Sequence, residues 1–157
     1  MFYEFCLKHF DFNGDGAVSK SELGSVKVLD CSSSGLYSLD GLEYFTSLDT
    51  LKCSNNKIKE LDLSQNKNLR FLDCSYNLIQ KLDISATAVS TLYCAPMDDE
   101  KGNNLLEYLF IFRGQEIEGV TYGRDAAKVR RIPAQTKIVS VPSSKDGDTD
   151  TEEKARS

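Results

Sequence analysis

The hydrophobic residues in the first two thirds of the chain recur in a fixed order. An apolar residue is followed three positions later by a leucine, and two positions after that by a cysteine. The leucines are Leu29, Leu51, Leu72 and Leu92, and the cysteines are Cys31, Cys53, Cys74 and Cys94. Successive cysteines follow one another at 22, 21 and 20 residues. The alternation of buried-type and polar residues predicts one short strand per unit, and the regular period predicts that the strands stack in parallel.

Each unit continues in the same way after its cysteine. Asparagine follows three positions later at Asn56 and Asn77, with Ser34 in that place in the first unit. Further apolar residues follow at Leu36, Ile58 and Ile79, and then at Leu39, Leu61 and Leu82. The pattern matches L-x-x-L-x-L-x-x-N-x-L, the signature of a leucine-rich repeat, with cysteine at the second strand leucine. We expect the asparagines to satisfy backbone groups where the chain turns away from the sheet.

The repeated cysteines have two interpretations. They can be small buried hydrophobes in a column, or they can form a metal or redox ladder. The sequence has five cysteines, no CxxC pair and a single histidine, His9, which lies outside the repeats. These features favour buried thiols over zinc ligands or disulfides.

The repeat fades after Cys94. We interpret APMDDEKGNN as a loop and LLEYLFIFRGQEIEGVTYG as one more strand, a turn and a second strand, with Leu106, Leu109 and Ile111 pointing inward. RIPAQTKIVSVP can add an edge strand, and the final SSKDGDTDTEEKARS is expected to be disordered. The predicted division is an N-terminal cap over 1–25, repeats over 26–95, C-terminal capping strands over 96–142 and a tail over 143–157.

The stretch DFNGDGAVSKSE precedes the repeats and fits the EF-hand loop D-x-[DN]-x-[DN]-G-x₅-E. Calcium needs six to eight oxygen ligands, and the donors at the loop positions are Asp11, Asn13, Asp15, Ala17 through its carbonyl, Ser19 and Glu22. The exit helix is cut short by Gly24 and no second hand follows. The motif therefore predicts half an EF-hand with a structural rather than a sensory calcium site.

A simpler interpretation of the same stretch is a solvated turn. Ser19 would then be a helix N-cap with Glu22 as its capping-box partner. This interpretation explains Ser19 and Glu22, but it does not explain the spacing of Asp11, Asn13 and Asp15.

Residues 3–95 resemble bacterial leucine-rich-repeat proteins with an N-terminal EF-hand-like segment, which repeat LDLS-x-N-x-x-L and L-x-C-x-N-N. The resemblance implies the calcium role for the six loop residues. It also implies export or a cell-surface location and binding to other proteins or surface ligands. The first residues, MFYEFCLKHF, lack the features of a signal peptide, so a cytoplasmic location is also compatible with this chain.

The fold class that follows is an α/β-type leucine-rich-repeat solenoid. We expect a short parallel sheet on its concave face, an N-terminal helix with the EF-hand-like loop as one cap, and a C-terminal strand or hairpin as the other. Aligned outward positions would gather aromatic residues at the C-terminal half of the concave face, namely Phe71, Tyr93, Tyr108, Phe110 and Phe112. Such a cluster is either a partner-binding surface or a local core beneath the C-terminal cap.

The net charge, the apolar runs and the acidic residues argue against several classes of function. The net charge of −5 argues against nucleic acid as a partner, because no basic face is available for phosphates. No run of apolar residues is long enough to span a membrane. Asp98, Asp99, Glu100 and His9 do not form a catalytic set that can be placed in one site. We therefore expect a non-enzymatic module that recognises a protein or surface polymer, or alternatively a purely structural calcium-stabilised spacer of a larger surface protein.

Overall fold

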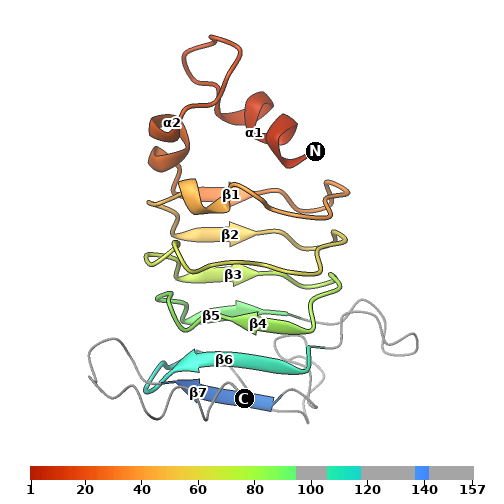
Figure 1. The fold of residues 1–157 in the computed structure, drawn as a ribbon, viewed down its shortest axis with the longest axis vertical. Helices are drawn as coiled ribbons and strands as arrows, with labels where there is room; N and C mark the ends of the chain where they lie inside the picture. Colours follow the sequence, from red (N-terminus) through yellow and green to blue (C-terminus); the bar gives the residue numbers. More distant parts are fainter. Residues whose placement is uncertain (95–105, 118–136, 142–157) are drawn as a thin grey trace.

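The computed structural model describes residues 1–94, 106–117 and 137–141. They form a stack of coils with two short helices at one end (Figure 1). In chain order the elements are α1 (Phe2–Phe10), α2 (Lys20–Ser25), β1 (Val28–Asp30), the 3₁₀ helix η1 (Leu42–Tyr44), β2 (Thr50–Lys52), β3 (Phe71–Asp73), β4 (Lys81–Asp83), β5 (Thr91–Tyr93), β6 (Tyr108–Phe112) and β7 (Lys137–Val141).

The predicted strands form one parallel sheet, here called the first sheet, in the order β1-β2-β3-β5. The middle residues of these strands, Leu29, Leu51, Leu72 and Leu92, lie in register and are completely buried. Their neighbours on either side point away from the core because side chains alternate along a strand. The parallel, repeat-built sheet predicted from the sequence is thus confirmed.

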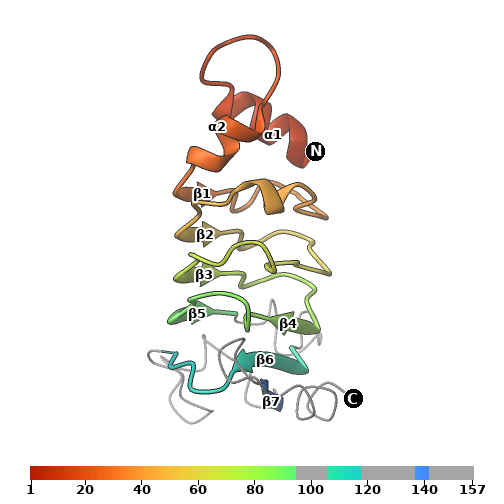
Figure 2. The same cartoon turned by 60° about the vertical axis from the view of Figure 1, so that its left-hand side comes forward.

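The position predicted for the strand that contains Tyr108–Phe112 is wrong. β6 does not continue the first sheet but pairs in parallel with β4, and β7 pairs in parallel with β6, which gives a second sheet in the order β4-β6-β7. Figure 2 shows β5 below β1–β3 on one side of the stack and β4 on the other side. β7 lies within RIPAQTKIVSVP, the predicted edge strand, whereas most of the second strand predicted for LLEYLFIFRGQEIEGVTYG lies outside the described residues.

The repeat spacing explains this difference. Leu106 and Leu109 are three residues apart, as are Ile79 and Leu82 in the preceding coil, and all four are buried. Leu109 lies in register with Leu82. The chain after Cys94 therefore completes the coil that β5 begins, and the longer stretch between Cys94 and Leu106 obscures the repeat. Leu106 and Leu109 are buried as predicted, whereas Ile111 is only partly buried.

Asparagines hold the turns between the coils, as predicted. The Asn56 amide donates to the carbonyl oxygens of Cys31 (3.0 Å) and Cys53 (2.9 Å), and its oxygen accepts from the N–H of Leu36 at 2.9 Å. Asn77 makes the equivalent bonds one coil later. Each asparagine thus connects its own coil to the preceding one.

The aromatic face of α1 covers the first coil. Phe2 and Cys6 belong to the main core, and the ring centroids of Phe2 and Phe10 lie 6.1 and 5.7 Å from that of Phe45. Leu23 of α2 is buried in the same cluster. No helix in the described ranges is long and apolar enough to cross a membrane.

Candidate functional site

The outward face of the first sheet carries two columns of side chains, one column for each outward strand position. They are Val28, Thr50, Phe71 and Thr91; then Asp30, Lys52, Asp73 and Tyr93. Ser32, Ser54 and Ser75 follow two residues beyond the strand ends, and Ser75 is buried. The hydroxyl groups of Ser54 and Ser32 are 3.2 Å apart. Hydroxyl, charged and aromatic groups therefore stand side by side on one face.

Phe71 and Tyr93 form the aromatic part of this face. They lie on the neighbouring strands β3 and β5, with ring centroids 5.6 Å apart. Both side chains are half-buried, and the Lys52 ammonium lies 6.0 Å from the Phe71 centroid. These two predicted partner-binding residues are brought together.

Lys52 lies in register with Asp30 and Asp73 on the neighbouring strands, where opposite charges can form ion pairs, but these pairs do not form. Among the described residues, Lys52 is not within ion-pair distance of either Asp30 or Asp73. Each aspartate instead accepts the N–H of the serine two positions later, Ser32 or Ser75, at 3.1 Å. This local turn holds the carboxylate at the strand end, so the lysine ammonium lies over the aromatic ring instead.

Tyr108, Phe110 and Phe112 do not join Phe71 and Tyr93, which corrects the predicted five-residue cluster. They lie on β6 in the second sheet, where Tyr108 and Phe110 have centroids 6.3 Å apart. The ammonium groups of Lys81 and Lys137 lie 5.7 and 5.6 Å from the Tyr108 ring. All three aromatic side chains are half-buried. The predicted single surface is therefore two separate aromatic groups.

The acidic loop between α1 and α2 folds back on its own backbone. Asp11 accepts the N–H groups of Gly14 (2.8 Å), Asp15 (3.1 Å) and Gly16 (3.0 Å). The Asn13 oxygen accepts the Asp15 N–H, and the Asp15 carboxylate accepts the Ala17 N–H. Gly16 has φ +85°, which is costly for any residue with a side chain.

Glu22 closes the loop from its far end. One carboxylate oxygen accepts the N–H groups of Phe12 (3.0 Å) and Asn13 (3.2 Å), which follow Asp11 directly. The other accepts the N–H and hydroxyl of Ser19, whose own oxygen accepts the Glu22 N–H. The capping box of the simpler interpretation is therefore present. The Ser19 backbone bond, followed by the Ser19 hydroxyl, holds the pKa of Glu22 below its ordinary value.

The column of cysteines is buried and unoxidised. Cys6, Cys31, Cys53, Cys74 and Cys94 are all free thiols. Burial raises the pKa of Cys6 to about 11 and that of Cys31 and Cys74 to about 12. Thiols with such pKa values are protonated at neutral pH and are poor nucleophiles and metal ligands. The predicted burial of the repeated cysteines is confirmed.

Sequence reasoning missed several polar residues. The buried Asn66 amide donates to the carbonyls of Leu42 and Phe45, and the buried Gln115 amide donates to that of Val89. LDLSQN matches the LDLS-x-N motif of the resembled repeat proteins, and this match was the available signal for Asn66. No role was predicted from the sequence for three aspartates that each directly follow a buried leucine, namely Asp40, Asp62 and Asp83.

Comparison with known proteins identifies the repeats. Residues 46–86 match the family model described as leucine-rich repeats, in two copies. Internalin J of Listeria monocytogenes serotype 4b (strain F2365) is 37% identical over 57 residues, which are 36% of this chain and 6% of internalin J. Residues 46–86, which include β2, β3 and β4, are therefore leucine-rich repeats.

One solved structure is also similar in part. It is described as the functional domain of InlJ from Listeria monocytogenes, which includes a cysteine ladder. The comparison has a TM-score of 0.38 at 23% identity and covers 79% of this chain and 32% of that chain. The present chain thus spans a small part of both relatives.

Proposed function

We propose that this chain is a non-enzymatic recognition module that binds a protein or surface polymer through the outward face of the first sheet. This face is the concave face of the expected solenoid. The observation that carries the proposal is the pair of Phe71 and Tyr93 on adjacent strands, with centroids 5.6 Å apart. Aromatic side chains that are half-buried and packed against each other offer a large contact area at a low cost in conformational entropy.

The residues around Phe71 and Tyr93 can form the polar rim of a binding surface. Thr50, Thr91 and Asp73 flank the rings in register, and Lys52 lies over Phe71. Interfaces commonly have an aromatic centre surrounded by hydrogen-bonding groups. The resemblance to bacterial leucine-rich-repeat proteins supports a location at the cell surface or outside the cell.

A capture experiment tests the proposal. Immobilised intact chain is incubated with solubilised surface material and the retained molecules are quantified by mass spectrometry. The same is done with Phe71→Ala, Tyr93→Ala and Tyr37→Ala, the last removing an exposed aromatic residue outside the first sheet. We expect one set of molecules to be retained by the intact chain and by Tyr37→Ala and to be lost from the other two. Equal retention by all four proteins would favour the structural spacer instead.

We also propose that the loop from Asp11 to Glu22 holds a structural calcium ion. Asp11, Asn13, Asp15, Ser19 and Glu22 would supply side-chain oxygens and Ala17 its carbonyl. The fit rests on the closure of the loop, in which Glu22 reaches the N–H of Phe12 at 3.0 Å. No three His, Cys, Asp or Glu side chains in the described ranges are grouped closely enough to hold a metal by themselves. Asn13, Ala17 and Ser19 are therefore essential to the proposed ligand set.

A further inference from the structure

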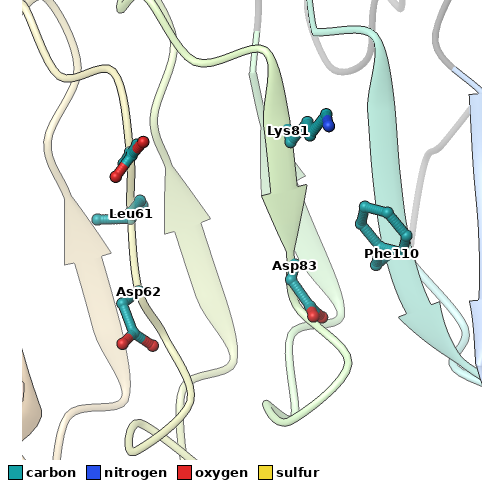
Figure 3. A pocket seen from close by; sticks show the side chains of 6 residues that line it. Leu61, Asp62, Lys81, Asp83 and Phe110 are labelled. Atoms are coloured by element: carbon teal, nitrogen blue, oxygen red, sulfur yellow. The ribbon is translucent and has the colours of Figure 1, made fainter. Parts of the chain in front are cut away.

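A groove runs over the side of the stack that carries the second sheet. It is lined by Glu60, Leu61, Asp62, Lys81, Asp83 and Phe110 and has a volume of about 310 Å³. Figure 3 shows Asp62 on one coil, Lys81 and Asp83 on the next, and Phe110 on β6 beyond. Leu61 and Phe110 supply the apolar part of the described lining, and the three carboxylates supply most of its charge.

A second hollow of about 510 Å³ extends the groove along the stack. The two share Glu60, Leu61 and Asp62, and the second continues to Asp40 and Glu43. We call the combined feature the side groove. Among the described residues, the carboxylates that line it are Asp40, Glu43, Glu60, Asp62 and Asp83, and the basic residue is Lys81.

The repeat itself builds the side groove. Each Leu-Asp pair, at 39–40, 61–62 and 82–83, buries the leucine and turns the aspartate outward. Each of these three coils therefore contributes one carboxylate. In the next coil the corresponding residue is Phe110, which lies in register with Asp83. An aromatic wall therefore stands at the end of an acidic column.

Local hydrogen bonds hold two of these carboxylates, those of Asp62 and Asp83, in place. Asp62 accepts the N–H of Ser64, and Asp83 accepts that of Ser85, both at 2.9 Å. The Ser64 hydroxyl, followed by its N–H, lowers the pKa of Asp62. Within the described part of the chain, neither Glu60 nor Asp62 makes an ion pair. The Lys81 ammonium lies 5.7 Å from the Tyr108 ring. Because it interacts with this ring, it neutralises the groove carboxylates less completely.

We propose that the side groove docks an extended, arginine-containing segment of a polypeptide partner. Negative charge distributed along a groove is complementary to guanidinium groups distributed along a chain. A guanidinium can pair with a carboxylate through two parallel hydrogen bonds and can also stack on an aromatic ring such as Phe110. A metal ion is a poorer fit, because no three of these acids converge among the described residues. This second surface does not depend on binding at the first sheet.

The test uses fluorescein-labelled (Gly-Arg)₄, (Gly-Lys)₄ and (Gly-Glu)₄ peptides, titrated with the intact chain and measured by fluorescence anisotropy. The groove variant is Glu60→Gln with Asp62→Asn. The matched control is Asp30→Asn with Asp73→Asn, which removes the same charge from the first sheet. We expect the groove variant to weaken (Gly-Arg)₄ binding by about tenfold and the control by less than about twofold.

Two further results separate docking from general attraction to an acidic protein. (Gly-Arg)₄ should bind several-fold tighter than (Gly-Lys)₄, and Phe110→Leu should remove most of that difference. Amide chemical shifts in the intact chain should move around Leu61, Asp62 and Lys81. Equal weakening by the two double variants, equal binding of the arginine and lysine peptides, or shifts confined to other residues would each overturn the proposal.

Discussion

Single buried amides account for much of the connection between coils. Asn56 is 2% exposed, donates to two cysteine carbonyls and accepts two N–H groups of the preceding coil, those of Ser34 and Leu36. Asn56→Ala leaves these groups buried without partners. We expect a loss of about 3 kcal/mol in the free energy of unfolding, measured by urea denaturation.

Asn68→Ala is the matched control for this substitution. Asn68 is exposed and donates only to the Thr46 carbonyl, at 3.2 Å. We expect it to cost less than about 1 kcal/mol, because water can replace the exposed bond. Similar losses for the two variants would show that Asn56 does not join the coils in the way described.

The buried thiols should not react with thiol reagents in the folded protein. Burial raises the pKa of Cys53 and Cys94 well above the ordinary value of 9.0. Reaction with DTNB at neutral pH should therefore release well under one equivalent from the native chain and five after unfolding. Ala86→Cys, at an exposed position, should add one fast-reacting equivalent. Two or more fast native thiols in the unmodified chain would contradict the buried column.

Among the helices, α2 depends on its capping box. It has six residues, too few for stability without its cap and its packing, and Ser19→Ala removes one half of the box. We expect a loss of about 1 kcal/mol, measured by thermal denaturation. Ser25→Ala, at the other end of α2, should cost less than about 0.5 kcal/mol, because the Ser25 hydroxyl bonds to a carbonyl in an exposed position.

The same box makes the loop sensitive to acid. The pKa of Glu22 is lower in the folded chain than its ordinary value of 4.5, so the charged form stabilises the fold. That contribution is present above pH 4.5 and is lost as the pH falls through the folded pKa. Glu22→Gln should therefore show a smaller fall in melting temperature below pH 4.5 than the unmodified chain. An unchanged profile would contradict the role of Glu22 in closing the loop.

The strands show where sequence reasoning succeeds and where it stops. β1, β2, β3 and β5 were predictable because leucine and cysteine recur at a nearly constant period. β6 was misplaced because YLFIF alternates as a strand on either side of a coil would, and alternation does not identify the side. The spacing of Leu106 and Leu109, shared with Ile79 and Leu82, was the signal that distinguishes the two sides.

At the scale of the whole molecule, a calcium ion bound in the loop should stabilise the packing of the N-terminal helices on the rest of the fold. If the loop binds the ion only when folded, chelator should lower the melting temperature by roughly 5 to 10 °C relative to saturating calcium. Asp11→Ala with Glu22→Gln should abolish this difference, whereas Asp30→Ala should keep it. Calorimetric titration with calcium, with magnesium as competitor, measures the binding directly. No heat of binding would leave the loop as a capped turn.

The candidate sites were predictable only in part. The acidic loop could be proposed as a calcium site because its candidate donors are close in sequence. Phe71 and Tyr93 could be paired because a repeat converts sequence spacing into neighbouring strands. The side groove was not found, because its walls come from different coils and its shape depends on where β6 lies. Local capture of Asp30 and Asp73 by serine N–H groups also could not be weighed against pairing with Lys52 before their geometry was known.

Site-specific photo-crosslinking tests the recognition surface most directly. A benzophenone amino acid is placed at Thr50 and at Thr91, which flank Phe71 in register, and at Tyr37 outside the first sheet. After irradiation with solubilised surface material, we expect the Thr50 and Thr91 proteins to form covalent adducts with the same molecule and the Tyr37 protein to form none with it. Adducts from Tyr37 alone, or none above background at Thr50 and Thr91, would contradict binding at the first sheet.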